Sequence, residues 1–395
     1  IAIEQAVARR WLTLETILQS RLDRAWSTIQ PEIRSAMLVG AAQILLLDRI
    51  PTHAAVDDAV EWTKRRVRPK AGGFVNAVLR RIAELPTGES EPFDPDQRDH
   101  LPKADGSAMV LNDEVFAEEP AHRIAQQTGH ADALIAHWTA TMGFARTIDL
   151  CRHDLVHPPI IITDVPPDTP DCTAHDEPGH YVFTGSMNAL RTLFAKHPLA
   201  RVQDAGTSTA VHLAAPLAPK LIIDFCAGRG TKSKQLAAMF PNAEVVAADP
   251  DPARFAVLEE LAARLPNITA AGPEALETYH GRADLVVLDL PCSNTGVLPR
   301  RPEAKAGFRM KRLRSLETLQ RSIMAQALPL RAESGHVLQI TCSLERLENE
   351  DQSAHLARWF PLRVCEQKRA RPTGLPGEPA TGYRDGGYAA LLAPV

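Results

Sequence analysis

The sequence predicts an α/β protein with a mainly parallel sheet, covered by helices on both faces and preceded by a small all-helical domain. Beyond about residue 202, short and almost continuous apolar runs alternate with helical segments. The apolar runs are 221–223, 245–247, 285–288 and 337–340. Strands buried on both faces have this composition, and their alternation with helices is typical of a parallel sheet. Residues 1–85 instead place apolar residues at helical spacing, without strand-like alternation.

Composition narrows the class of protein. The chain has 395 residues, too many for one ordinary core, so two or three domains are expected. Its net charge of −4 is unlike that of a uniformly basic nucleic-acid binder, but its basic residues are clustered. The six cysteines are sparse and form no Cys-x-x-Cys pair, which argues against disulfides and against a zinc site and suits a reducing cytoplasm. No apolar run approaches the roughly 20 residues of a membrane helix.

Breaks in the pattern divide the chain into four expected parts. Residues 1–85 form the helical domain, punctuated by Pro51 and by Gly72-Gly73. Residues 86–120 are rich in proline, glycine and acidic residues, and we interpret them as a linker. Residues 121–200 are mixed and predict a small α+β subdomain with a strand at 160–162. Residues 201–395 carry the parallel sheet.

A glycine-containing segment follows the apolar run 221–223 and opens a helix. Glycines let a ligand approach the backbone closely, and the free amides of a helix start can bind it. About twenty residues later Asp249 ends the next strand, where a carboxylate can accept ribose hydroxyls. Neither a dinucleotide fingerprint nor a Walker motif is present, so a nucleoside without a phosphate chain fits better than a nucleotide; a purely structural turn is the alternative. The candidate binding residues are Cys226, Ala227, Gly228, Arg229, Gly230, Thr231, Lys232, Asp249 and Asp289.

Two further strands each end in a cysteine. The run 285–288 leads into Asp289 and Cys292, and the run 337–340 leads into Cys342. Ligands of open α/β sheets bind at the carboxyl ends of the strands. A single buried cysteine is most often just a small apolar residue. Two at the same expected edge of one sheet favour a catalytic role, in which a thiolate acts as nucleophile.

These three motifs, together with Glu348-Asn349-Glu350, resemble in order and spacing those of the RNA (cytosine-5)-methyltransferases of the RsmB/NOP/NSUN type, over residues 200–395. The resemblance implies a Rossmann-like domain that binds S-adenosylmethionine through the residues named above. It also implies that Cys342 attacks the base and that Cys292 assists resolution of the adduct. DNA cytosine methyltransferases attack with the cysteine of a Pro-Cys motif, here Cys292, and the Thr341-Cys342-Ser343 segment favours the RNA type.

The implied chemistry explains the need for a thiol. Carbon 5 of cytosine is a poor nucleophile, and a thiolate bonded to carbon 6 makes it able to attack a methyl group. An acid near N3, for which Asp289 is the candidate, helps the addition. Two segments depart from the family pattern: 227–232, where Ala-Pro-Gly-Gly-Lys is common, and 272–274, where Gly-Asp-Ala is usual. A catalytically weakened RNA-binding assembly factor is therefore the alternative function.

The N-terminal part extends the resemblance. Segments 47–56 and 73–81 look like the NusB-like RNA-binding domain of RsmB-type enzymes, here truncated at its first helix. This implies 16S ribosomal RNA or an assembly intermediate as partner and a monomeric protein, with transfer RNA as the alternative substrate. Phosphate-binding candidates come from two basic clusters, and a third cluster at Lys368, Arg369 and Arg371 is interpreted as a solvated face. The candidates are Lys64, Arg65, Arg66, Arg300, Arg301 and Lys305.

Overall fold

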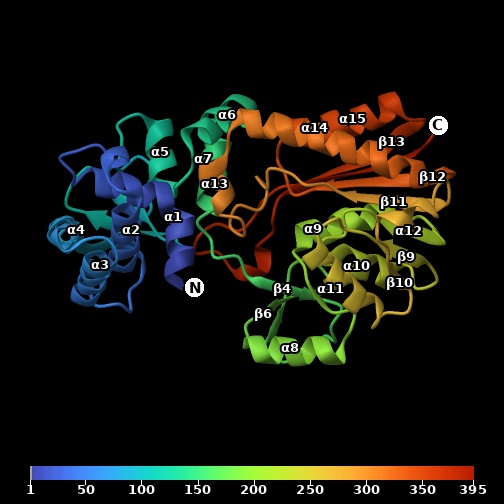
Figure 1. Cartoon of the computed structure of the whole chain (residues 1–395), viewed down its shortest axis with the longest axis horizontal. Coiled ribbons are helices and arrows are strands. Elements are labelled where there is room, and N and C mark those ends of the chain that lie inside the picture. Colours follow the sequence, from blue (N-terminus) through green and yellow to red (C-terminus); the bar gives the residue numbers. More distant parts are fainter. Residues whose placement is uncertain (1) are drawn as a thin grey trace. The chain divides into compact units, whose positions relative to one another are not determined.

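The computed structural model describes residues 2–395, which form two compact units (Figure 1). The first unit contains the chain up to His157, together with Leu298–Arg309 and Leu375–Glu378. The second contains Pro158–Val297, Met310–Gly374 and Pro379–Val395. Within residues 2–395, no helix combines the length and apolar character needed to cross a membrane.

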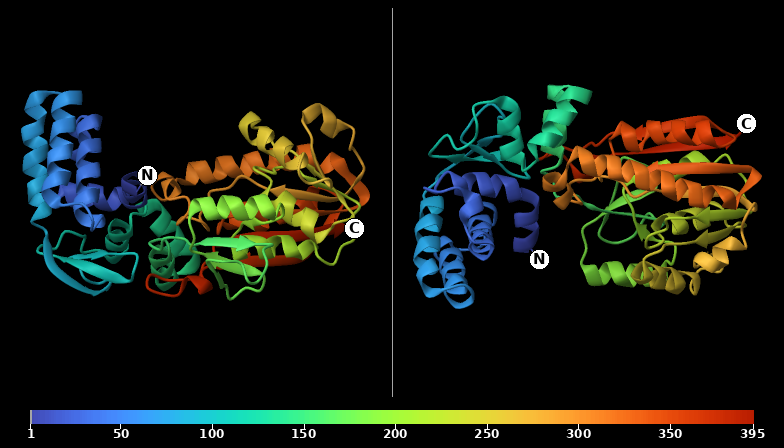
Figure 2. Two further views of the ribbon diagram at one scale, coloured as in Figure 1. Left: turned by 90° about the horizontal axis from the view of Figure 1, so that it is seen from below. Right: turned by 45° about the horizontal axis from the view of Figure 1, so that its top comes forward.

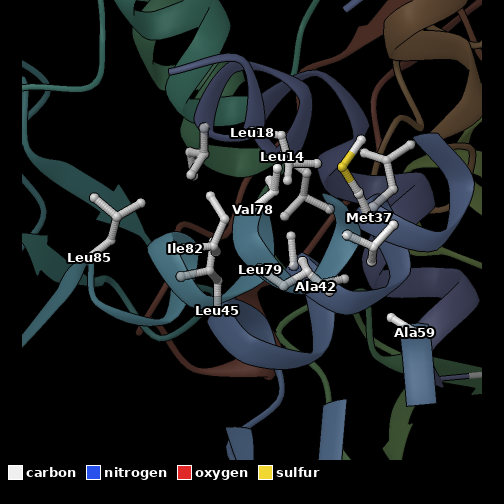
Figure 3. Close-up of a cluster of buried hydrophobic side chains, with 14 of the residues drawn as sticks. Leu14, Leu18, Met37, Ala42, Leu45, Ala59, Val78, Leu79, Ile82 and Leu85 are labelled. Carbon is white, nitrogen blue, oxygen red and sulfur yellow. The ribbon is translucent and has the colours of Figure 1, made fainter. Parts of the chain in front are cut away.

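Four helices build the core of the first unit, in agreement with the helical domain that the apolar spacing predicted for this part of the chain. Proline occupies the first turn of two of them, where its missing N–H is not needed. Figure 3 shows the buried side chains that hold them together, among them Leu14, Met37 and Leu79, each with no exposed surface. The helices are α1 (Ala2–Gln19), α2 (Pro31–Leu46), α3 (Thr52–Arg66) and α4 (Pro69–Ala83).

The segment expected to be a linker, 86–120, differs from that expectation because it contains a three-stranded antiparallel sheet. Its strands β1 (Pro86–Pro92), β2 (His100–Pro102) and β3 (Ser107–Leu111) lie in the order β1-β3-β2. Leu101 and Leu111 anchor this sheet in the helical core. Gly88 and Gly106 have φ values of 89° and 90°, so the glycines that suggested a flexible linker instead permit turns of a folded element.

Three of the remaining helices of the first unit lie in the region expected to start a mixed subdomain, and the fourth comes from the segment Leu298–Arg309. They are α5 (Pro120–Thr128), α6 (Asp132–Met142), α7 (Phe144–His153) and the short α13 (Glu303–Gly307). Gly129, at φ 77°, ends α5 in the left-handed conformation that favours glycine. Residues up to 157 thus cluster with the helical domain rather than with the strands that follow.

The second unit opens with a small antiparallel sheet that includes the strand predicted at 160–162. Its order is β5-β6-β4-β7. The strands are β4 (Ile160–Thr163), β5 (Cys172–Ala174), β6 (His180–Phe183) and β7 (Arg201–Val202), and helix α8 (Met187–Lys196) follows β6.

A seven-stranded sheet of order β10-β9-β8-β11-β12-β14-β13 dominates the second unit. The first five strands in this order are parallel, and β14 runs antiparallel between β12 and β13. The strands are β8 (Leu221–Asp224), β9 (Glu244–Ala247), β10 (Ile268–Ala270), β11 (Ala283–Asp289), β12 (Arg331–Thr341), β13 (Leu362–Ala370) and β14 (Gly387–Pro394).

Helices cover both faces of this sheet, which confirms the predicted fold class (Figure 2). One face packs against α9, α10 and α11, and the other against α14 and α15. The helices are α9 (Ala205–Val211), α10 (Thr231–Met239), α11 (Pro252–Ala262), α12 (Pro273–Glu277), α14 (Met310–Ala327) and α15 (Glu350–Trp359).

Candidate active site

The predicted cofactor segment is the loop between β8 and α10. Gly228 and Gly230 have φ values of 58° and 79°, which favour glycine. A Cβ on Gly230 would lie 2.5 Å from Cδ2 of Leu261, so no side chain fits between the loop and α11. A Cβ on Gly228 would meet no atom within 4 Å, so this part of the loop borders open space. Arg229 is exposed and Ala227 is buried.

Asp249, just after β9, completes this region. Its Oδ2 accepts a hydrogen bond from the Gly228 amide (3.0 Å) and its Oδ1 accepts one from the Asp251 amide (3.0 Å). Its carboxylate can also accept hydroxyl donors, and the open space beside Gly228 allows a ligand to approach the loop. The donor and acceptor set therefore fits a nucleoside cofactor. Burial raises the pKa of Cys226, which keeps this thiol protonated and unsuited to nucleophilic attack.

The two cysteines predicted at strand ends meet in the structure. Strands β11 and β12 are parallel neighbours, with Asp289 paired to Ile340, so the loops that follow them lie side by side. Sγ of Cys292 is 3.1 Å from Sγ of Cys342, and the Cys342 thiol also donates to Oδ1 of Asn294 (3.0 Å). The hydrogen bond to Cys342 and burial hold the pKa of Cys292 well above its usual range.

A cavity lies beside Cys342. Asp289 and Lys232 also line it, and Nζ of Lys232 donates to Oδ2 of Asp289 (2.6 Å). Burial acts to lower the pKa of Lys232, but the adjacent Asp289 carboxylate outweighs it and the pKa is raised. A protonated lysine thus holds a carboxylate at the cavity wall, next to a thiol.

Sequence reasoning missed the residues that fix the two cysteine loops. The Glu348 carboxylate accepts hydrogen bonds from the Ser293 amide (2.8 Å), the Ser293 hydroxyl (2.6 Å) and the Ser343 hydroxyl. The Asn349 side chain donates to the Ser343 carbonyl (2.9 Å) and accepts from the Thr341 hydroxyl. The sequence identified Glu348 and Asn349 only as part of a family-like motif, without a structural role. Their position just after Thr341-Cys342-Ser343 is the feature from which that role could have been predicted.

Asn294 is the other residue that was not predicted. Its φ of 62° is a left-handed conformation that asparagine adopts more readily than most residues. Besides accepting from Cys342, its amide donates to the Cys292 carbonyl (3.3 Å). A contact that joins residues 292, 294 and 342 depends on the register of two strands far apart in the sequence.

The predicted phosphate-binding residues have different surroundings within the first unit. Lys64, Arg65 and Arg66 are exposed at the end of α3, and the first two pair with Glu61 at 2.8 and 3.7 Å. Arg301 is exposed and Arg300 is half-buried.

The prediction that Lys305 contacts RNA is wrong, because its side chain is only 1% exposed. Its ammonium donates to the carbonyls of Thr128 (3.2 Å) and Asp154 (3.3 Å), and burial lowers its pKa to about 8. These hydrogen bonds anchor the segment 298–309 inside the first unit. Because the ammonium group is buried, it has no access to a nucleic acid.

Family comparison agrees with this geometry. Residues 211–372 match the model of the 16S rRNA methyltransferase RsmB/F family, and residues 2–84 match the NusB family. The fold and site define an S-adenosylmethionine-dependent methyltransferase. Residues 211–372 are thus similar to the RsmB/F type, and a NusB-like region precedes them.

Relatives match the chain over most of its length, and solved structures have a similar fold. The ribosomal RNA small subunit methyltransferase B of Vibrio cholerae is 29% identical over 98% of this chain and 87% of its own length. The probable ribosomal RNA small subunit methyltransferase B of Bacillus subtilis is 25% identical over 82% of this chain and 71% of its own. The crystal structure of PH0851 has the same fold, with a TM-score of 0.74 at 18% identity over 99% of this chain and 89% of that one. A methyltransferase homolog from Pyrococcus horikoshii gives a TM-score of 0.55 at 17% identity over 69% of this chain and 98% of that one.

Proposed function

We propose that this protein transfers a methyl group from S-adenosylmethionine to carbon 5 of a cytosine in RNA, through a covalent bond between Cys342 and carbon 6. Small-subunit ribosomal RNA is the proposed substrate, supported by the names of the relatives and by the NusB-like region. In this proposal, residues 1–85 bind RNA, with Lys64, Arg65 and Arg66 on phosphates, and residues 201–395 carry the chemistry.

The observation that carries the proposal is the unequal placement of the two thiols. Cys342 lines the cavity together with Asp289 and Lys232, whereas Cys292 is buried and its sulfur contacts that of Cys342. A thiol must reach the base to attack it, and Cys342 is the member of the pair that lines the cavity. This supports the RNA-type assignment over the DNA type, in which Cys292 would attack.

The residues of the cavity suggest a sequence of steps. Bound S-adenosylmethionine supplies an electrophilic methyl group. The Cys342 thiolate adds to carbon 6, while the Asp289–Lys232 pair provides a proton-bearing partner for N3. After carbon 5 is methylated, its proton leaves to a base, the bond between Cys342 and carbon 6 breaks, and the double bond between carbons 5 and 6 re-forms.

Cys292 is suited to the last of these steps. Its raised pKa keeps it a thiol, and it touches the sulfur that must depart. A proton supplied by Cys292 makes Cys342 a better leaving group as the adduct collapses. In this proposal the two steps use different protonation states: Cys342 attacks as a thiolate, and Cys292 resolves the adduct as a protonated thiol.

Methyl transfer from labelled cofactor to unmodified small-subunit ribosomal RNA tests the proposal, with the site mapped by bisulfite sequencing. Cys342→Ala should abolish transfer, and Cys365→Ala, which removes an exposed thiol on β13, should leave it unchanged. Transfer RNA and duplex DNA serve as competing substrates. Full activity of Cys342→Ala would overturn the mechanism, and a failure of the wild-type protein to bind the cofactor in calorimetry would support an RNA-binding assembly factor instead.

A further inference from the structure

The end of strand β13 contributes a lysine to the cavity that the sequence had assigned to a solvated face. Lys368 and Ala370 both line the cavity beside Cys342. Side chains alternate along a strand, so the intervening Arg369 belongs to the other face, where it pairs with Glu350 of α15. One basic cluster is thus divided between a structural ion pair and the wall of the cavity.

Strand register fixes the place of Lys368 relative to the reacting thiol. Ile340 of β12 pairs with Ala389 of β14, which pairs with Lys368 of β13. Two strand spacings separate Ile340 from Lys368, which is about 10 Å. Strand β13 is antiparallel to β14 and therefore parallel to β12, so its carboxyl end lies at the same edge of the sheet as Cys342.

The cavity wall between Cys342 and Lys368 carries little side chain. Gly386, which precedes β14, and Gly387, its first residue, line it there. A Cβ on Gly387 would lie 2.7 Å from the Thr341 carbonyl oxygen, so the strands pack too closely for a larger residue. Cys342 and Lys368 line the same cavity, so a single ligand in it can contact both.

The charges of the cavity leave Lys368 available to an anion. Lys232 is engaged by Asp289. The Lys368 side chain is exposed, and within residues 2–395 it takes part in no ion pair or hydrogen bond. An exposed ammonium group at the rim of a site attracts phosphate strongly, because nucleic-acid affinity rests largely on such contacts.

The order of the strands separates this lysine from the cofactor segment. Asp249 follows β9 and the glycine loop follows β8, on one side of β11 and β12; Lys368 is on β13, on the other side. We infer that Lys368 binds the phosphodiester group next to the target cytidine and so holds the nucleotide with its base at Cys342. This inference rests on the proposed function, since it requires RNA in the cavity.

Binding of a fluorescent single-stranded RNA with one central cytidine tests it, measured by anisotropy in the absence of cofactor. Lys368→Met should weaken binding about tenfold and reduce the slope of log affinity against log salt by about 0.7. Lys368→Arg should restore most of the affinity. The matched control is Lys220→Met, which removes an exposed lysine just before β8, at the opposite edge of the sheet.

A second RNA locates the contact. In it a neutral methylphosphonate replaces the phosphodiester on one side of the cytidine, and a third RNA carries it on the other side. One replacement should weaken binding to the wild-type protein and have no further effect on Lys368→Met. Equal losses for both proteins, or an unchanged salt slope in Lys368→Met, would overturn the inference.

The two proposals fail separately in these measurements. If wild-type protein methylates cytosine in ribosomal RNA and Lys368→Met binds and reacts like it, the role of Lys368 is wrong and the function stands. If Lys368→Met shows the binding defect but the wild-type protein transfers no methyl group, the phosphate contact stands and the catalytic proposal falls.

Discussion

Replacing Glu348 by glutamine tests how the two cysteine loops are held together. The Glu348 side chain is fully buried, and burial raises its pKa to about 7 even though hydrogen bonds from Ser293 and Ser343 act to lower it. Glutamine has nearly the same shape and keeps an oxygen for the Ser293 amide. Its amide group can donate to the two serine hydroxyls, which are able to accept. The substitution therefore removes the ionisable proton and little else.

The sign of the effect follows from the raised pKa. The ordinary value is 4.5, so the folded protein holds this proton more tightly than the unfolded chain does. The wild-type protein gains its full stability from this group below about pH 4.5 and loses it as the pH rises through about 7. At 1.36 kcal/mol per pKa unit, the loss in unfolding free energy is on the order of 3 kcal/mol. Glu348→Gln should be about as stable as wild type in acid and more stable by a comparable amount above neutrality.

The unfolding free energy of the second unit can be measured in urea at several pH values, with hydrogen exchange of peptides from β11 and β12 as the signal. Burial also raises the pKa of Asp224 to about 7, so both proteins should lose stability as the pH rises. The difference between them isolates Glu348. The reasoning is refuted if the two proteins show parallel pH profiles, or if the glutamine variant is destabilised equally at every pH.

Three other substitutions have distinct expected results. Cys292→Ala should accumulate a covalent protein–RNA adduct that survives denaturing electrophoresis and disappears in the double variant with Cys342→Ala; a wild-type level of free product would contradict the resolving role. Asp249→Ala should weaken S-adenosylmethionine binding by about 1–3 kcal/mol, measured by calorimetry, because ribose hydroxyls lose an acceptor. Burial lowers the pKa of Lys305, so the wild-type first unit should gain stability as the pH rises from about 8 towards 10.5, and Lys305→Met should show no such gain in thermal unfolding.

The sequence was sufficient to predict how the site is positioned. Continuous apolar runs identify parallel strands, and parallel strands end at one edge, so the sequence alone predicts that Asp289, Cys292 and Cys342 lie together. The contact between Asn294 and Cys342 was not predictable, because it depends on a single left-handed residue and on the register of β11 with β12.

Composition predicted poorly which basic residues are exposed and whether the segment 86–120 is a linker. A cluster of basic residues predicted exposure, yet Lys305 is enclosed because two carbonyl oxygens satisfy its ammonium group. Residues 86–111 lack the alternation of an amphipathic strand, since only a few side chains such as Leu101 and Leu111 reach the core. Short strands of this kind differ little from a linker in composition.

In the proposed function, the division of labour between the two thiols arises from the fold rather than from the residues themselves. Both cysteines follow buried parallel strands, and their sulfurs are in contact, so proximity to the base cannot distinguish them by itself. Glu348 fixes both loops, through the Ser293 amide and hydroxyl and through the Ser343 hydroxyl, and in this arrangement the Cys292 side chain is buried. Cys342 is left at the cavity wall. A base in the cavity therefore meets one thiol directly and the other only through it, and this order suits a reaction in which one sulfur forms a bond and the next supplies the proton that breaks it.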